Sequence, residues 1–314
     1  MAQEFDFYDK TSLKSYNLNE SMRYQINMLD SLDVFTRKHC ENVASLTCRI
    51  CEYLHCKKGF IEYCTICAYL HDIGKLFIPP EILQKPGKLT DEEYETMKTH
   101  TSMGYEMCIK DEKLRPYAAG PLYHHEALNG TGYPQGLTKK KIPYEGQIIR
   151  VADEYDAIVS KRQYKSHVGI SDTLKILIEN TKPNKELQKS DALHVLAEDA
   201  KLGKNNPLIV RTLFKVVIDD IEYEITCTLD YVEELKQELK RFKEIDKYKE
   251  KMEKAKKEKE KNYYLEGINI LLKENETLEN YSVIYEEYQK AYDTRKKIID
   301  NLYSEIKKIK KLKI

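Results

Sequence analysis

The spacing of apolar residues along the first two thirds of the chain predicts a succession of helices. Segments such as ENVASLTCRICEYL and FIEYCTICAYL carry apolar residues at helical intervals. We expect five helices around the chemistry-bearing residues: one through His39, one that ends at Gly74, one that begins at Thr90-Asp91 and carries His100, one that ends near His124-His125, and one through Asp153. Glycine and proline gather between them, where loops shape sites.

The segment PLIVRTLFKVVIDDIEYEIT admits two interpretations. Apolar residues recur every four positions from Leu213 to Ile225, which favours a helix. A hairpin that turns at Asp219-Asp220 is the alternative, because β-branched residues are dense there. The hairpin is disfavoured since no glycine is available for the turn.

From Tyr231 onward the chain is rich in Lys, Glu, Leu and Tyr and has no proline, so long helices are expected. Two stretches show the 3-4-3 spacing of a coiled coil or antiparallel helical pair: Val232, Leu235, Leu239 and Phe242, then Ile299, Leu302, Ile306 and Ile309. The charged run KYKEKMEKAKKEKEKN between them is typical of a solvated helix or linker. Its interleaved glutamates disfavour contact with a membrane or nucleic acid.

Composition narrows the class of protein. Lys plus Arg and Asp plus Glu both number 52 in 314 residues, so the chain lacks the basic excess of a general duplex nucleic-acid binder. The N-terminus has no apolar leader, and no stretch reaches about 18 uncharged apolar residues. We therefore expect a cytoplasmic protein without a membrane span.

Eight cysteines include two Cys-x-x-Cys pairs, Cys48 with Cys51 and Cys64 with Cys67. Such pairs occur in structural zinc sites. Both pairs, however, lie in segments of helical apolar spacing, where cysteine acts as a small hydrophobic core residue. The core interpretation is favoured over zinc, and disulfides are not expected in a reducing cytoplasm.

A different set of side chains predicts a metal centre. The doublet His71-Asp72 is accompanied along the chain by further imidazoles and a carboxylate: His39, His100, His124, His125 and Asp153. Each histidine alone is more often an ordinary surface or core residue, but the set favours a shared cluster. Imidazole with carboxylate suits iron, manganese or zinc. A carboxylate such as Asp72 can bridge two cations about 3.5–4 Å apart.

The strings RKHCENVA, LHDIGKLFIPPEILQKPGKLT, HHEALNGTGYPQGL and IPYEGQIIRVADEYDAIVSKRQYK resemble the HD-GYP family, the branch of HD phosphohydrolases that hydrolyses cyclic di-GMP. The resemblance runs in order from about His39 to Pro207 and implies an all-α, HD-type helical bundle. It places metal ligands at His39, His71, Asp72, His100, His124, His125 and Asp153. It also places Lys75 at the scissile phosphate, and Gly132, Tyr133, Pro134, Arg162 and Lys165 on the substrate side.

Three positions depart from the family pattern. Asn129 stands where aspartate is frequent, and Gln163 replaces a proline. Members with a third metal carry a glutamate one helical turn before the first ligand histidine, where this chain has Phe35. We therefore expect two divalent cations, with Phe35 keeping water from that side of the cluster.

Composition along the chain predicts a domain division, and the resemblance implies an activity. We expect an N-terminal helical strap over 1–30, the HD-GYP catalytic domain over 31–230 and a charged helical extension over 231–314. The expected activity is hydrolysis of cyclic di-GMP to linear pGpG and then GMP. There are two alternatives. The substrate is a hybrid cyclic dinucleotide, or the chain is a binding or scaffold protein without turnover. The C-terminal helices offer a surface for a homodimer or a protein partner.

Overall fold

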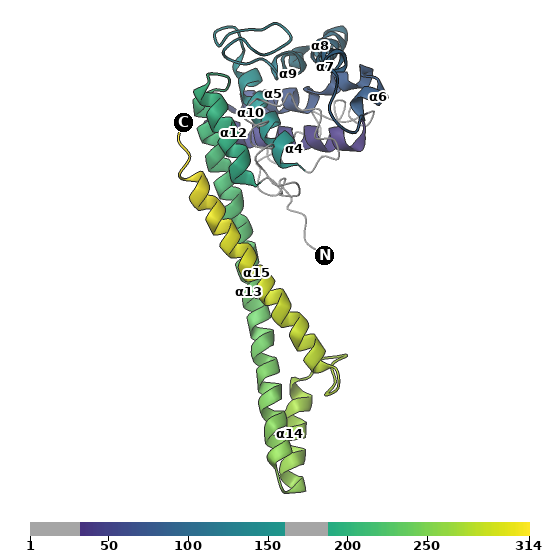
Figure 1. Ribbon diagram of the computed structural model, residues 1–314, viewed down its shortest axis with the longest axis vertical. Helices are drawn as coiled ribbons and strands as arrows, with labels where there is room; N and C mark the ends of the chain where they lie inside the picture. Colours follow the sequence, from purple (N-terminus) through teal and green to yellow (C-terminus); the bar gives the residue numbers. More distant parts are fainter. Residues whose placement is uncertain (1–31, 161–187) are drawn as a thin grey trace. The chain divides into compact units, whose positions relative to one another are not determined.

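The computed structural model describes residues 32–160 and 188–314, and these are helical apart from loops and one isolated antiparallel bridge between Asn129 and Thr138 (Figure 1). The expected all-α class is confirmed. The expected strap over 1–30, and Arg162 and Lys165, lie outside the described residues.

Two packed helices, α4 (Val34–Tyr53) and α5 (Lys58–Leu70), form the first layer around the core. Asp33 caps α4 by accepting hydrogen bonds from the backbone N–H of Phe35 and of Thr36, both at 3.0 Å. A short 3-10 helix, η2 (Ile73–Phe77), follows α5. α5 thus ends at Leu70, four residues before the expected end at Gly74, and His71 and Asp72 lie at the junction between the two elements.

The remaining helices of this part are shorter. They are α6 (Pro80–Leu83), α7 (Asp91–Lys98), α8 (His100–Lys110), η3 (Arg115–Tyr117), α9 (Ala119–Tyr123), α10 (Tyr144–Val159) and α12 (Lys189–Lys201). α7 begins after Thr90, as expected, with a capping box to Glu93. The expected single helix through His100 is divided, because the Thr99 N–H bonds to Thr96 and tightens the backbone before α8.

Gly74 determines how closely η2 approaches α8. A Cβ atom added at Gly74 would lie 1.9 Å from the carbonyl oxygen of His100, so no other residue fits without movement of the backbone. This close approach brings the Asp72 end of η2 against the first residue of α8. Two elements that carry candidate ligands are thereby held side by side.

The four paired cysteines, Cys48, Cys51, Cys64 and Cys67, are fully buried in α4 and α5, as expected for small core residues. All eight cysteines of the chain are free thiols. Burial raises the pKa of the Cys48 thiol to about 12, which disfavours a thiolate. Within the described residues, no three of these four thiols gather into a group of possible metal ligands.

The segment after Pro207 forms one long helix, α13 (Pro207–Lys254), so the hairpin alternative is wrong. The apolar residues that recur every four positions, Leu213, Val217, Ile221 and Ile225, are all buried. Neither Asp219 nor Asp220 adopts the positive φ that a tight hairpin turn requires. The helical period therefore decides this segment over its β-branched content.

Contacts divide the chain into two units, with the division between Ile218 and Asp219 and with Lys308–Ile314 grouped with the first unit. In the second unit, α14 (Glu258–Leu271) and α15 (Tyr281–Ile309) pack with part of α13 around Phe242, Ile245, Ile268 and Tyr281. Arg241 donates to the Leu271 carbonyl and to both carboxylate oxygens of Glu276.

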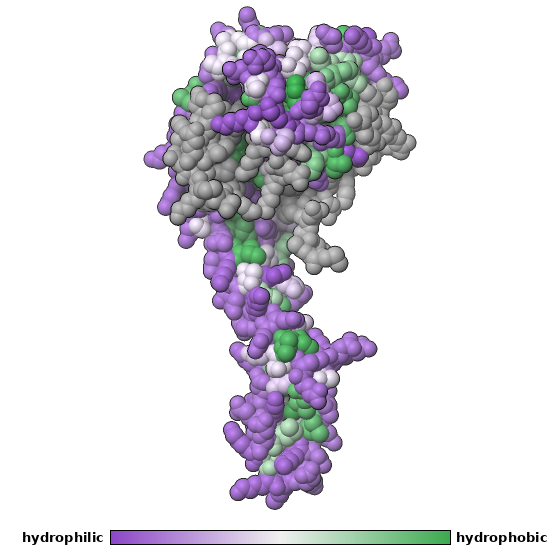
Figure 2. All heavy atoms as spheres, turned by 45° about the vertical axis from the view of Figure 1, so that its right-hand side comes forward, coloured by the Kyte–Doolittle hydropathy of each residue, from purple (hydrophilic) through white to green (hydrophobic). Residues whose placement is uncertain are grey.

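Hydrophilic residues cover most of the face of this second unit that Figure 2 shows, and apolar residues are confined to a narrow strip. The expected long, charged helices are therefore present. In the described parts of the chain, no helix is both long and apolar enough to cross a lipid bilayer.

Candidate metal centre

The described candidate ligands converge from five places in the fold. They are contributed by α4 (His39), the junction of α5 and η2 (His71 and Asp72), the start of α8 (His100), the end of α9 (His124 and His125) and α10 (Asp153). All are buried except His125, which is half-buried. Burial of this many titratable groups is costly without a compensating partner.

One group of ligand atoms comprises His39, His71 and Asp153. His39 Nε2 lies 2.9 Å from Asp153 Oδ1 and 3.3 Å from His71 Nε2, and His71 Nε2 lies 3.8 Å from the same Asp153 oxygen. These atoms are mutually within 4.8 Å. We call this set the His39 half of the centre.

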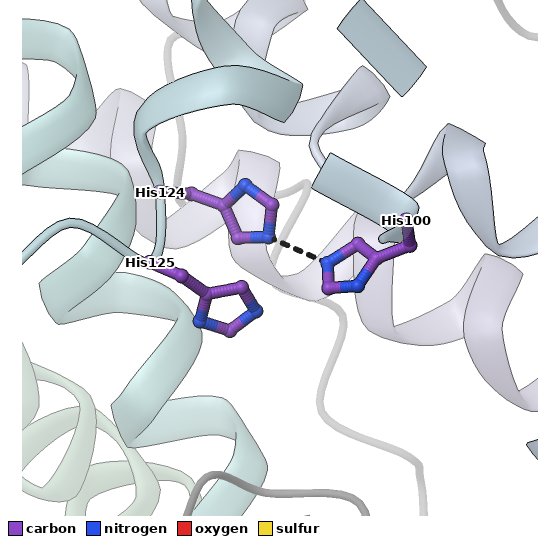
Figure 3. A group of neighbouring side chains, drawn as sticks. All are labelled: His100, His124 and His125. Atoms are coloured by element: carbon purple, nitrogen blue, oxygen red, sulfur yellow. Dashed lines mark hydrogen bonds between the residues drawn. The ribbon is translucent and has the colours of Figure 1, made fainter. Parts of the chain in front are cut away.

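A second group comprises His100, His124 and His125 (Figure 3). The Nε2 atoms of His100 and His124 are 3.2 Å apart, and the His125 ring lies beside both, with centroids 5.2 Å from His100 and 4.1 Å from His124. We call this set the His100 half.

Asp72 stands between the halves, with one carboxylate oxygen toward each. Its Oδ2 lies 3.3 Å from His71 Nε2 and 3.7 Å from His39 Nε2. Its Oδ1 lies 3.4 Å from His100 Nε2 and 3.9 Å from His124 Nε2. This is the geometry that a carboxylate shared by two cations requires.

Hydrogen bonds to the outer nitrogens of four histidine rings determine which ring nitrogen faces the centre. His71, His100 and His124 place Nδ1 within 2.6–3.0 Å of backbone carbonyls of Ala68, Met97, Gly120 and Pro121. His39 Nδ1 lies 2.6 Å from Asp156 Oδ2. An Nδ1–H donor leaves the Nε2 lone pair pointing inward, as in histidines that bind metals.

The arrangement of His100 and His124 indicates whether a cation fits between their rings. Burial lowers the pKa of His100 to about 4 and that of His124 well below its usual range, so both rings are neutral near pH 7. With the proton on Nδ1, two Nε2 lone pairs face each other at 3.2 Å and cannot bond to each other. A divalent cation accepts both lone pairs, so the donor set fits a metal.

The carboxylates supply the negative charge of the centre. Burial alone would raise the pKa of Asp72, but Lys75 and His71 hold it well below its usual range. Burial would likewise raise the pKa of Asp153, but His39 and His71 beside it hold that pKa below its usual range. Burial acts against a charged His71, yet its pKa is raised because Asp72 attracts the proton. The same field attracts a cation.

Lys75 lies at the edge of the centre, with Nζ 2.5 Å from Asp72 Oδ2. The contact joins residues three positions apart, across the first turn of η2. Lys75 is 11% exposed in its side chain. Lys75 is therefore mostly buried and paired with Asp72.

The loop with Gly132, Tyr133 and Pro134 packs against His125. A Cβ at Gly132 would lie 2.4 Å from the His125 carbonyl oxygen, and the Tyr133 ring stacks on the His125 ring at 4.6 Å and 24°. The Tyr133-Pro134 peptide is cis. One face of Tyr133 is thus used by His125, a contact that the sequence did not indicate.

Three residues that were not predicted from the sequence also hold this site. Glu126 accepts from the backbone N–H of Gln135 and of Leu137, both at 2.7 Å, and so anchors the loop. Arg150 donates to the His125 carbonyl at 3.1 Å. Asp156 bonds to His39. Its i,i+3 spacing from Asp153 on α10 was a visible signal, because residues three apart share a helix face.

Phe35 does not act as expected. Its side chain is 54% exposed, so it does not keep water from the His39 half. The physical reason is its place in the first turn of α4, where the buried face of the helix has not yet begun; the first buried residue is His39.

Comparisons with known proteins identify the family of the chain. The family model described as HD domain matches residues 23–185, about half of the chain. A cyclic di-GMP phosphodiesterase of Thermotoga maritima is 40% identical over 165 residues, which are 50% of this chain and 45% of the relative. A 3′3′-cGAMP-specific phosphodiesterase of Vibrio cholerae is 32% identical over 154 residues, 48% of this chain and 35% of the relative.

A third relative, a cyclic di-GMP phosphodiesterase response regulator of Xanthomonas campestris, is 45% identical over 96 residues, 30% of this chain and 25% of the relative. The chain thus spans less than half the length of these relatives. The family model nevertheless covers the segments from His39 to Asp153 that carry both halves of the centre. The chain belongs to the HD domain family, in its HD-GYP branch.

Proposed function

We propose that this chain is a metal-dependent phosphodiesterase that hydrolyses cyclic di-GMP to linear pGpG and, after a second cleavage, GMP. The observation that carries the proposal is the position of Asp72, whose two carboxylate oxygens face two separate groups of imidazole nitrogens. Two cations shared by one carboxylate are a recurrent arrangement in enzymes that cleave phosphate esters. The cytoplasm is the expected compartment, because thiols such as this chain's eight stay reduced there.

The proposed ligands are His39, His71 and Asp153 for one cation, His100, His124 and His125 for the other, and Asp72 for both. Iron or manganese suits these donors best, and zinc is compatible with them. When bound, such cations polarise a phosphoryl oxygen and lower the pKa of water toward about 7. We propose two cations because the position of Phe35 offers no carboxylate for a third.

The chain's own residues would orient the phosphodiester and manage charge. Water forms a bond to phosphorus as the bond from phosphorus to the 3′ oxygen breaks, and the products carry a 5′ phosphate and a 3′ hydroxyl. Lys75 would leave Asp72 to stabilise the developing charge or to protonate the leaving oxygen.

Recognition of the bases and phosphates is proposed for the loop and the following segment. The Tyr133 ring would line the guanine pocket, with Gly132 and Pro134 setting the loop's path. Arg162 and Lys165 would bind phosphate, at a spacing that lets both side chains reach one group if the segment is helical.

A hybrid cyclic dinucleotide is the second candidate substrate. It is favoured by the relative from Vibrio cholerae whose name specifies 3′3′-cGAMP, because its identity to this chain is of the same order as that of the cyclic di-GMP enzymes. Both substrates contain the same phosphodiester ring, so the metal centre does not distinguish them.

A panel of substrates tests the proposal. Manganese-loaded or ferrous protein is incubated with cyclic di-GMP, 3′3′-cGAMP and cyclic di-AMP, and products are separated by chromatography. We expect linear pGpG to form fastest. Faster cleavage of 3′3′-cGAMP would support the second candidate, and no cleavage of any ring would contradict both.

A further inference from the structure

We propose that Asp156 is a positioning residue that makes the two halves of the centre unequal, so that the His39 half binds its cation first and more tightly. The inference rests on the proposed function, because it concerns the cations of that centre. It goes further by assigning an order of loading and a residue that sets it.

Asp156 lies on α10 and is 4% exposed. One oxygen, Oδ2, is 2.6 Å from His39 Nδ1. The other, Oδ1, accepts hydrogen bonds from Asn42 Nδ2 at 3.1 Å and from Ser160 Oγ at 2.9 Å. Both oxygens are therefore occupied, and the carboxylate cannot rotate without losing bonds to two other residues.

These bonds determine the tautomer of His39. A carboxylate accepts but does not donate, so the His39 proton must reside on Nδ1 and the Nε2 lone pair must face Asp153 and His71. The other three rings with a fixed tautomer use neutral backbone carbonyls for this purpose. A charged acceptor makes the imidazole a stronger electron donor than a neutral one does.

The charges of the two halves also favour tighter binding of a cation in the His39 half. The His39 half contains Asp153, with Asp156 directly behind it. In the His100 half, the described ligands are three imidazoles, which bring no negative charge, and Asp72 provides the charge from one oxygen. Lys75 offsets part of the Asp72 charge, on the oxygen that faces the His39 half.

The carboxylates of Asp153 and Asp156 outweigh the one cationic side chain, Lys75, so the His39 half remains the more negative. Attraction of a divalent cation follows this charge difference. The first equivalent of metal therefore fills the His39 half, and the second equivalent, held by neutral rings and one shared oxygen, exchanges more readily. Turnover would then follow the supply of the second cation.

Asp156→Asn tests the role of the residue. An amide has one accepting and one donating atom. If its NH₂ faces His39, the His39 proton moves to Nε2 and blocks the metal; if its oxygen does, the charge is still lost. Loss of an outer carboxylate of this kind typically weakens metal affinity about 10–100-fold.

Metal-free full-length protein is titrated with Mn²⁺ by calorimetry and by electron paramagnetic resonance, which distinguishes single from paired manganese. Unmodified protein should show two affinities, with single-ion signals before paired ones. Asp153→Asn and His125→Ala identify which affinity belongs to which half. Ser160→Ala is the matched control, because it removes a bond to Asp156 and leaves the bond to His39.

We expect Asp156→Asn to weaken the tighter affinity about 10–100-fold and Ser160→Ala to change it little. Asp156→Glu keeps a carboxylate at this position. A tighter affinity in Asp156→Glu than in Asp156→Asn would show that the negative charge beside His39 matters. Unchanged binding in Asp156→Asn, or paired-ion signals from the first equivalent onward, would overturn the inference and leave the proposed function standing. Failure of the unmodified protein to bind Mn²⁺, Fe²⁺ or Zn²⁺ would overturn both.

Discussion

At the residue scale, the observed position of Lys75 does not match the role that we propose for it. It pairs with Asp72 at 2.5 Å, whereas the role we propose for it needs its charge at the phosphate. Lys75→Met keeps the length of the side chain and removes the charge. We expect metal content to be retained and turnover to fall about 100-fold or more, as for loss of one charge-stabilising group. Steady-state kinetics beside elemental analysis measures both. Lys85→Met, which breaks a pair with Glu93 instead, is the control. Full turnover in Lys75→Met would exclude a catalytic role.

The thiols give a second test at this scale. Burial raises the pKa of Cys48 to about 12, so its reactive thiolate is scarce at pH 8, whereas an ordinary exposed thiol with a pKa of about 8.5 is partly ionised. Cys227 is exposed. Iodoacetamide followed by peptide mass spectrometry should label Cys227 in the folded protein and Cys48 only after denaturation. Equal labelling rates would mean that the α4 cysteines do not lie in the core.

Sequence spacing placed the candidate ligands because each stands in a short string of recognisable chemistry, such as His71-Asp72 or His124-His125. The outer acceptors could not be found in the same way. Asp156 reaches His39 across 117 positions of the chain, and its role depends on α4 packing against α10. Carbonyl acceptors such as that of Ala68 carry no side-chain signal at all.

At the element scale, the close packing of η2 on α8 is the most demanding contact of the site. Gly74→Ala would place a methyl group 1.9 Å from the His100 carbonyl, so the two elements must separate. We expect a loss of about 2–4 kcal/mol in the free energy of unfolding, and weaker metal binding because Asp72 and His100 move apart. Gly59→Ala, within α5 and with no atom near the added methyl, should stabilise by up to about 1 kcal/mol. Chemical denaturation with metal quantitation compares the two; equal stabilities would contradict the packing.

Helix existence followed from apolar spacing, but two boundaries did not: α5 ends at Leu70 instead of Gly74, and the helix expected through His100 is divided. The stretch from Thr90 to Lys110 contains no proline, and its break before His100 comes from a tightened turn at Thr99. That turn places the His100 Nδ1 on the Met97 carbonyl. The site's geometry, rather than local propensity, therefore sets this boundary. The long α13, in contrast, was predictable from a regular four-residue period.

At the scale of the whole molecule, the second unit has a core of its own around Phe242. Truncation of a buried phenylalanine to alanine costs about 3–5 kcal/mol. Phe242→Ala should therefore destabilise residues 219–307 while hydrolysis and metal content persist, because Phe242 contacts none of the candidate ligands. Hydrogen exchange read by mass spectrometry, beside an activity assay, tests this. Loss of metal or turnover with the second unit alone unfolded would mean that the centre depends on that unit. The domain boundary at residue 230 remains a prediction.

The central claim is that the cluster around Asp72 holds the cations that cleave a cyclic dinucleotide. Asp72→Asn removes the negative charge shared by both halves while keeping nearly the same shape. The most direct measurement follows cyclic di-GMP and linear pGpG by chromatography for metal-loaded unmodified and Asp72→Asn protein, with metal content determined on the same samples. We predict pGpG from the unmodified protein, none above background from the variant, and less metal in the variant. Equal turnover by the two proteins would contradict the account.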